Sequence, residues 1–191
     1  IPVPDRVKRE GRKAKPEIEA WIASMEALAR ADVRLICYNF MPVVDWCRTE
    51  IDYETPTGST AMRFDQDKYM AFELHILERP GAEREYSAED RRRAAAAYEK
   101  MSEADKETLI TNIAKALPGS TSEPLTIPGF RDKLTQYRDI DADRLRQNLI
   151  EFLQEVTPAA EKLGMQLTLH PDDPPRPLFG LPRIASTEAD Y

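Results

Sequence analysis

One structural unit occurs twice in this sequence: an amphipathic helix, a tight turn, a short apolar strand and a polar loop containing proline. In the first copy, Pro16 suits the first helical position, apolar residues recur at helical spacing over 18–28, and residues 33–40 are expected to form a strand. In the second copy, the apolar stripe spans 145–163 and residues 165–169 form the strand. The repetition predicts two strands of the same sheet.

Two residues in the second copy are expected to interrupt or end its helix. Gly164 supplies the turn between helix and strand, because glycine readily adopts the left-handed conformation that ends many helices. Pro158 lacks a backbone N–H and is expected to kink the helix, or to end it early, near Thr157.

Helix, short turn and buried strand in repetition are typical of a parallel α/β sheet, and strands apolar on both faces need helices on both sides or a closed barrel. We therefore expect an α/β fold, part of a (β/α)8 TIM barrel, within a single incomplete domain over residues 1–191. The residues after each strand, 39–49 and 170–183, would then line one catalytic face.

A helical insertion is expected between the two parallel strands, over residues 60–130, because one crossover helix needs far fewer residues than separate them. Its helices are predicted at 65–77 and after the capping-box residues Ser87 and Ser102. The last of these is expected to end at 117–119, and a proline-rich connector follows at 120–129. Such an insertion would form a lid or an oligomer contact.

Composition excludes several function classes. The chain is 41% hydrophobic and 32% charged, as is usual for a soluble globular protein, and its net charge of −7 opposes nonspecific binding to nucleic acid or to an anionic membrane. No apolar run reaches the length of a membrane span, so the cytoplasm is the expected compartment. Cys37 and Cys47 are expected to be buried thiols, not a disulfide, and their spacing matches no zinc signature.

The ends of the chain suggest a piece of a longer protein. It opens on Ile1 without an initiator methionine, and it closes where Thr187 and Asp190 have the spacing that begins a helix. Residues that a functional site requires are therefore expected outside this chain.

His170 is the main candidate for chemistry. It directly follows the second strand, in a run with two aspartates and four prolines that must leave the sheet as a stiff loop. It could bind a divalent metal while Asp172 or Asp173 orients its imidazole. The alternative is a partly buried histidine that is hydrogen-bonded to its own loop. His75, inside a predicted helix, is expected to be structural.

The loop after the first strand also carries polar groups. Arg48 could bind a substrate carboxylate through both guanidinium nitrogens, Asp45 could bind hydroxyls, and Trp46 could wall a pocket of sugar size. The alternative is a structural loop that is anchored by Trp46 and held by an ion pair between Asp45 and Arg48.

Two long motifs together resemble one family. They are Cys37-Tyr38-Asn39-Phe40-Met41-Pro42-Val43 with Asp45-Trp46-x-Arg48-Thr49, and His170-Pro171-Asp172-Asp173-Pro174-Pro175-Arg176-Pro177 with Gly180-Leu181-Pro182-Arg183-Ile184. Both are similar to mannonate dehydratase, and residues 72–82 and 137–141 also fit that family. Cys47 stands where the family usually has threonine.

The resemblance implies a xylose-isomerase-like barrel that uses Mn²⁺ or Fe²⁺ to dehydrate D-mannonate, a sugar acid, to 2-keto-3-deoxy-D-gluconate in hexuronate (glucuronate) catabolism. It implies that His170 is a metal ligand. The family's other ligands (a cysteine, a second histidine and an aspartate) and its proton-transfer residues lie on later strands, so no catalytic residue is assigned in this chain. A homo-oligomer is expected.

Four further residues are expected to bind the substrate or to support the groups that do: Asp45, Arg48, Asp172 and Arg176. Two other readings stay open at this point. One is a metal-dependent sugar isomerase or epimerase on the same barrel, which would also place a strand-end histidine on a divalent ion. The other is a non-catalytic helical interaction module, which predicts no metal binding.

Overall fold

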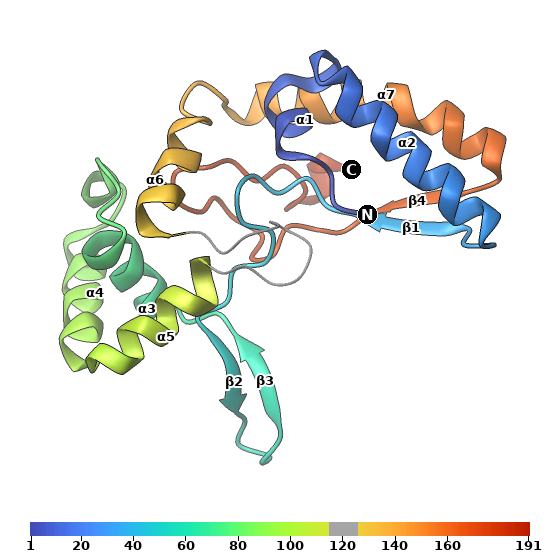
Figure 1. The fold of residues 1–191 in the computed structure, drawn as a ribbon. Coiled ribbons are helices and arrows are strands. Elements are labelled where there is room, and N and C mark those ends of the chain that lie inside the picture. Colours follow the sequence, from blue (N-terminus) through green and yellow to red (C-terminus); the bar gives the residue numbers. More distant parts are fainter. Residues whose placement is uncertain (115–125) are drawn as a thin grey trace. The chain divides into compact units, whose positions relative to one another are not determined.

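The structure is a computed structural model that describes residues 1–114 and 126–191. The chain forms two compact units (Figure 1). Unit 1 contains two separate segments, Ile1–Asp45 and Tyr137–Tyr191, and unit 2 is Trp46–Gln136. The predicted insertion over 60–130 falls within unit 2.

Unit 1 has the predicted α/β character. Its elements are α1 (Asp5–Glu10), a 3₁₀ helix (Gly11–Lys13), α2 (Lys15–Arg30), β1 (Leu35–Tyr38), α7 (Ala142–Leu163), β4 (Gln166–Leu169) and a second 3₁₀ helix (Glu188–Asp190). Strands β1 and β4 pair in parallel, from Leu35 opposite Gln166 to Tyr38 opposite Leu169. Two segments that are remote in sequence thus form one sheet, with α2 and α7 alongside it (Figure 1).

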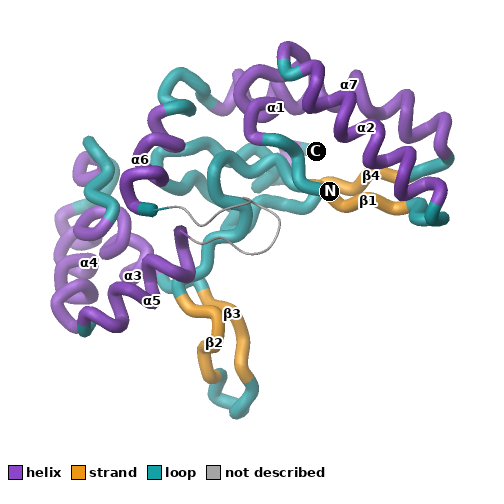
Figure 2. The backbone as a smooth tube through the Cα atoms, viewed as in Figure 1, coloured by secondary structure: helices purple, strands orange, loops and turns teal. Residues whose placement is uncertain are grey.

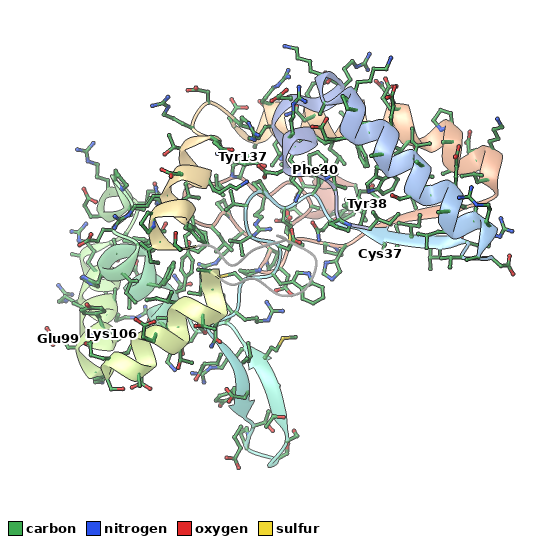
Figure 3. The ribbon with its side chains drawn as sticks, in the orientation of Figure 1. Cys37, Tyr38, Phe40, Glu99, Lys106 and Tyr137 are labelled. Atoms are coloured by element: carbon green, nitrogen blue, oxygen red, sulfur yellow. The ribbon has the colours of Figure 1, made fainter. Side chains whose placement is uncertain are left out.

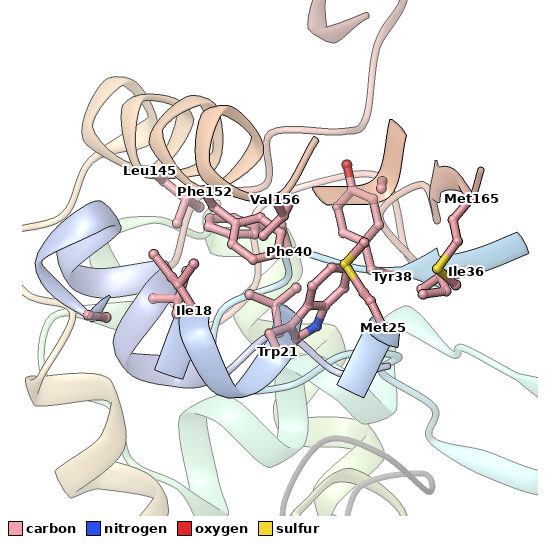
Figure 4. Packing of buried hydrophobic residues seen from close by; sticks show 14 of the residues in the cluster. Ile18, Trp21, Met25, Ile36, Tyr38, Phe40, Leu145, Phe152, Val156 and Met165 are labelled. Carbon is pink, nitrogen blue, oxygen red and sulfur yellow. The ribbon is translucent and has the colours of Figure 1, made fainter. Parts of the chain in front are cut away.

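The core of unit 1 lies between these helices and the sheet. Aromatic rings meet there edge to face: the centroid of Phe152 lies 5.1 Å from that of Trp21 and 6.1 Å from that of Tyr38 (Figure 4). The helical stripes predicted from the sequence supply this contact, because Trp21 and Met25 of α2 and Phe152 and Val156 of α7 are buried.

Only one face of β1 is buried within the described residues. Ile36 and Tyr38 are buried, whereas Leu35 is 59% exposed and the free thiol of Cys37 is exposed (Figure 3). Side chains alternate between the faces of a strand, so α2 and α7 cover one set and leave the other uncovered. The expectation of two buried thiols is therefore wrong for Cys37 and correct for Cys47.

Helix α7 continues through Pro158 to Leu163. The alternative that the helix ends near Thr157 is therefore wrong. The core explains why, since Val156 and Ala160 are buried on either side of the proline and hold both halves of the helix against unit 1. The predicted turn at Gly164 is confirmed, with φ of 63° at the C-cap.

Unit 2 combines helices with a hairpin. Its elements are β2 (Glu50–Glu54), β3 (Thr60–Arg63), α3 (Gln66–Ala71), a π-helical turn (Phe72–Ile76), a 3₁₀ helix (Ala82–Arg84), α4 (Ala88–Lys100), α5 (Glu103–Ala114) and α6 (Ile127–Thr135). Strands β2 and β3 are antiparallel, and α3 packs on α4 (Figure 2). The sequence reasoning did not foresee the hairpin.

The helix starts predicted in unit 2 are confirmed. Ser87 and Asp90 form a capping box on α4, and Ser102 and Asp105 make the same reciprocal contacts before α5. The end predicted at 117–119 lies outside the described residues. The connector predicted over 120–129 is too long, because α6 already begins at Ile127, with the Thr126 hydroxyl accepting from the Gly129 N–H. No described helix has the length and apolar character needed to cross a membrane.

Candidate functional site

The loops after β1 and β4 leave the sheet at the same edge. The backbone N–H of His170 donates to the carbonyl oxygen of Tyr38 at 2.7 Å, which extends the parallel pairing by one bond. Asn39 and His170 are therefore neighbours, each the first residue beyond its strand. In parallel α/β sheets, ligands bind at the carboxyl ends of the strands.

His170 is oriented by its own loop. Its Nδ1 lies 2.6 Å from the carbonyl oxygen of Pro171, and because a carbonyl can only accept, Nδ1 carries the proton. In the neutral ring the lone pair is then on Nε2. Metal-binding histidines commonly hold their other ring N–H on a carbonyl in this way, so the residue fits a divalent ion. The side chain is half-buried.

The described part of the chain supplies no complete metal site. Among the described residues, no three His, Cys, Asp or Glu side chains lie together as a ligand set. His170 would therefore contribute one ligand to a site that other residues complete.

Asp172 is buried and connects the loop after β4 to the segment beyond it. Its Oδ2 accepts from the backbone N–H of Ala185 at 2.6 Å and from the hydroxyl of Ser186 at 3.0 Å. Its Oδ1 lies 3.8 Å from the guanidinium of Arg183, which is also buried. The geometry suits a residue that shapes the loop around His170.

Asp45 is buried beside two cations at the end of the loop after β1. The ammonium of Lys8, on α1, lies 3.6 Å from Asp45 Oδ1 and donates to the carbonyl oxygen of Met41 at 2.8 Å. Arg183 donates to the carbonyl oxygens of Asp45 at 3.2 Å and Val44 at 2.8 Å. Burial lowers the pKa of Lys8, and the charge of Asp45 opposes that shift.

These four buried charged residues, Lys8, Asp45, Asp172 and Arg183, form what we call the loop network. Arg183 contacts both strand-end loops, so the network joins the loop that carries Asp45 to the loop that carries His170. Through Arg183 the structure thus connects two of the residues predicted from sequence, Asp45 and Asp172, and Asp172 lies in the same loop as His170.

The two predicted arginines belong to different units of the chain. Arg176 is half-buried in the loop after β4, and its backbone N–H donates to the carbonyl oxygen of Pro174 at 2.8 Å. Arg48 belongs to unit 2, where it is half-buried and its Nη1 donates to the carbonyl oxygen of Cys47 at 3.0 Å. His75, also in unit 2, is exposed and lies 5.1 Å from the ring of Tyr98, which is the structural role expected of it.

Comparison with known proteins identifies the family. Residues 1–191, the whole chain, match the family model described as D-mannonate dehydratase (UxuA). The chain belongs to the D-mannonate dehydratase family. The resemblance inferred from the two loop motifs is therefore confirmed.

Curated relatives in this family agree. The chain is 69% identical over 191 residues to the mannonate dehydratase of Brucella canis and 48% identical over 190 residues to that of Marinomonas sp.. The comparison covers 100% of this chain and 48% of each relative, so the chain spans about half the length of the curated relatives it matches. The crystal structure of mannonate dehydratase from Streptococcus suis serotype 2 superimposes with a TM-score of 0.62 at 25% identity, over 100% of this chain and 40% of that one.

Two residues of this D-mannonate dehydratase family member were not predicted from the sequence. They are Lys8, which belongs to the loop network, and Asn39, which lies at the end of β1. A lysine in a short polar helix gives no sign of burial, since only the distant loop after β1 encloses it. Asn39 belongs to the motif that spans Cys37 to Val43, but no function was predicted for it. Its signal was its place, directly after an apolar strand.

Proposed function

We propose that the full-length protein dehydrates D-mannonate to 2-keto-3-deoxy-D-gluconate with the help of a divalent metal, Mn²⁺ or Fe²⁺, in hexuronate catabolism. The observation that carries the proposal is His170, held at the carboxyl end of β4 with its Nδ1 proton on Pro171. Family membership supports it, as does the name of the relatives.

We also propose that β1 and β4 are two strands of a (β/α)8 barrel, with unit 2 as the insertion between them. The parallel pairing of strands from two distant segments supports this, together with the likeness to the Streptococcus suis enzyme. The loops after β1 and β4 would then belong to the catalytic face.

The reaction removes a proton from the carbon next to a carboxylate and then releases the neighbouring hydroxyl as water, which leaves an enol that becomes the 2-keto acid. A divalent ion that binds the carboxylate and a hydroxyl would stabilise the negative charge that develops. His170 would hold that ion. Proton transfer is assigned to residues beyond this chain.

The remaining predicted residues have two roles in this proposal. Arg48 and Arg176 are each proposed, separately, as a substrate-binding residue, because a guanidinium group binds a carboxylate through two parallel hydrogen bonds. Asp45 and Asp172 would act through the loop network, because their carboxylates are buried among Lys8 and Arg183.

We further propose a cytoplasmic homo-oligomer that binds neither nucleic acid nor membrane. The two free cysteines suit a reducing compartment, and the net charge of −7 opposes polyanions.

A coupled assay of the full-length protein on D-mannonate, after chelation and Mn²⁺ add-back, tests this function. We expect the 2-keto-3-deoxy product to disappear with the metal and to return with it. Metal binding without dehydration, but with interconversion of an aldose and a ketose, would support the isomerase instead. A full-length protein that neither binds metal nor turns over would support the interaction module.

A further inference from the structure

Asn39 is a half-buried residue whose side-chain oxygen has no hydrogen-bond partner among the described residues. This oxygen, Oδ1, is also shielded from solvent. Buried polar atoms in folded proteins are nearly always paired, because leaving one unpaired costs free energy. The site therefore lacks a group that would satisfy this amide.

The position of Asn39 separates it from the other unpaired polar atoms of unit 1. The indole nitrogen of Trp21 lies among the rings of the core. Asn148 and Arg183 each leave one atom unpaired but donate through another, to the carbonyl oxygens of Lys8 at 2.7 Å and Val44 at 2.8 Å. Asn39 instead follows β1 directly and sits across the parallel pair from His170. It is thus at the edge of the sheet where the proposed substrate would bind.

The side-chain amide of Asn39 can rotate to present either its oxygen or its nitrogen to a ligand. A half-turn about the bond between Cβ and Cγ exchanges Oδ1 with Nδ2, and no hydrogen bond to a described residue holds Oδ1 in its present place. Either atom can then face the half-exposed side of the residue. An amide accepts a hydrogen bond through its oxygen and donates through its nitrogen, which matches the hydroxyl groups of a sugar acid.

We propose that Asn39 binds a hydroxyl of the substrate, with Oδ1 accepting the hydroxyl proton. This assignment rests on the proposed function, since it places a polyhydroxy acid beside His170. The hydroxyls that neither leave nor flank the departing proton, those on C4, C5 and C6, are the candidates. Asn39 would then help to select an aldonate of the correct length and stereochemistry.

Asn39→Ala in the full-length protein tests the inference. We expect kcat/KM for D-mannonate to fall about tenfold or more, the net effect of one lost hydrogen bond to a substrate hydroxyl, while Mn²⁺ content stays unchanged. The matched control is Gln166→Ala, which removes an exposed amide from the opposite end of the same sheet and is expected to leave kcat/KM unaltered.

Aldonates that lack one hydroxyl, at C4, C5 or C6, make the test specific. The penalty of Asn39→Ala should vanish for one of the three and persist for the other two, which a general disturbance of the fold would not produce. An equal penalty on all of them, an unchanged kcat/KM, or loss of Mn²⁺ by the variant would overturn the assignment.

A failure of the proposed function gives a different pattern, because wild-type protein would then not dehydrate D-mannonate at all. Calorimetric binding of the same aldonates to Mn²⁺-loaded protein supplies a readout that needs no turnover. Weaker binding by the Asn39 variant, limited to aldonates that keep one particular hydroxyl, would still support the contact. Equal binding by both proteins, or binding by neither, would overturn it.

Discussion

The charged residues near the strand ends of unit 1 fall into two groups that differ in burial. The loop network is enclosed, whereas His170 and Arg176 are half-buried and keep contact with solvent. A buried charge is tolerated when opposite charges and hydrogen bonds compensate it, as they do for Lys8 beside Asp45. The network is therefore best understood as the support that fixes the two strand-end loops.

Lys8→Met should lower the free energy of unfolding by about 3 kcal/mol, because it leaves the buried carboxylate of Asp45 without its cation. Urea denaturation of the full-length protein measures this. The double variant with Asp45→Asn should lose less than the sum of the two single losses, since the second change removes the uncompensated charge. Strictly additive losses would show that the two side chains do not interact.

The pKa of Lys8 has a consequence for pH dependence. Burial lowers it below the ordinary 10.5, so between the lowered value and 10.5 the unfolded chain binds a proton that the folded chain does not. The contribution of Lys8 to the free energy of unfolding should therefore rise with pH across this window and stay constant below it. Carbon-13 NMR of labelled lysine should show one side chain that titrates early and is absent from Lys8→Met. A full set of ordinary titrations would contradict the burial.

His170→Ala should remove most of the bound metal from the full-length protein while changing its melting temperature little, because the half-buried ring contacts its own loop. Metal analysis after dialysis, together with thermal unfolding in chelator, separates the two effects. A variant that keeps its metal content and turnover would exclude His170 as a ligand.

Prediction from sequence succeeded for the position of His170, which directly follows β4, whereas its role as a metal ligand stays a prediction. His170 stood out because an apolar strand ends directly before it and prolines force the chain to turn away. Lys8 and Arg183 were beyond such reasoning, since their burial arises from contacts with the loop that ends at Asp45. No pattern within a few residues of Lys8 distinguishes it from a surface lysine.

At the scale of elements, the helices that line the core were the most predictable. The stripes of α2 and α7 have one clear period, and Gly164 marks where α7 ends. The hairpin β2–β3 was missed because its strands are short and largely exposed, although Glu50–Glu54 alternates between polar and apolar residues and Gly58 lies in the turn that follows. The length of α7 was underestimated, since packing on both sides of Pro158 overrides the local preference of proline.

Two glycines with positive φ differ in what a side chain would cost. Gly164 is in the left-handed helical conformation, with φ of 63° and ψ of 35°, and a Cβ there meets nothing within 4 Å. Gly11 has φ of 57° and ψ of −133°, which L-residues rarely adopt, and a Cβ there would lie 2.2 Å from Glu151 Oε2. Gly164→Ala should therefore cost about 1 kcal/mol, and Gly11→Ala should cost clearly more. Thermal unfolding of both variants measures this, and equal losses would contradict it.

At the scale of the whole molecule, the division into two units follows from contacts between segments that are distant in sequence. Unit 1 joins two distant segments through one sheet and one core, and Tyr137, the first residue of its second segment, donates to Asp5 Oδ1 at 2.5 Å. Unit 2 is formed by one continuous stretch. The sequence analysis predicted an insertion over 60–130, whereas unit 2 spans Trp46–Gln136, because boundaries between units depend on contacts and not on local composition.

The two-stranded sheet of unit 1 predicts how this 191-residue chain behaves when it is produced alone. Each strand has one side without a strand partner among the described residues, and Leu35 is exposed. Such edges favour association. Light scattering should show self-association that Leu35→Lys reduces. A monodisperse monomer at high concentration would contradict this.

The pairing of Leu35 with Gln166 also sets an order of events during synthesis. The ribosome produces β1 early, yet its partner emerges only after all of unit 2 has been made. Closing so long a loop is entropically costly and slow, whereas the contacts of unit 2 are available sooner. Unit 2 is therefore expected to become compact first in the cell. Strand β1 stays unpaired until α7 and β4 have been synthesised, and its apolar side chains are accessible to chaperones during that time.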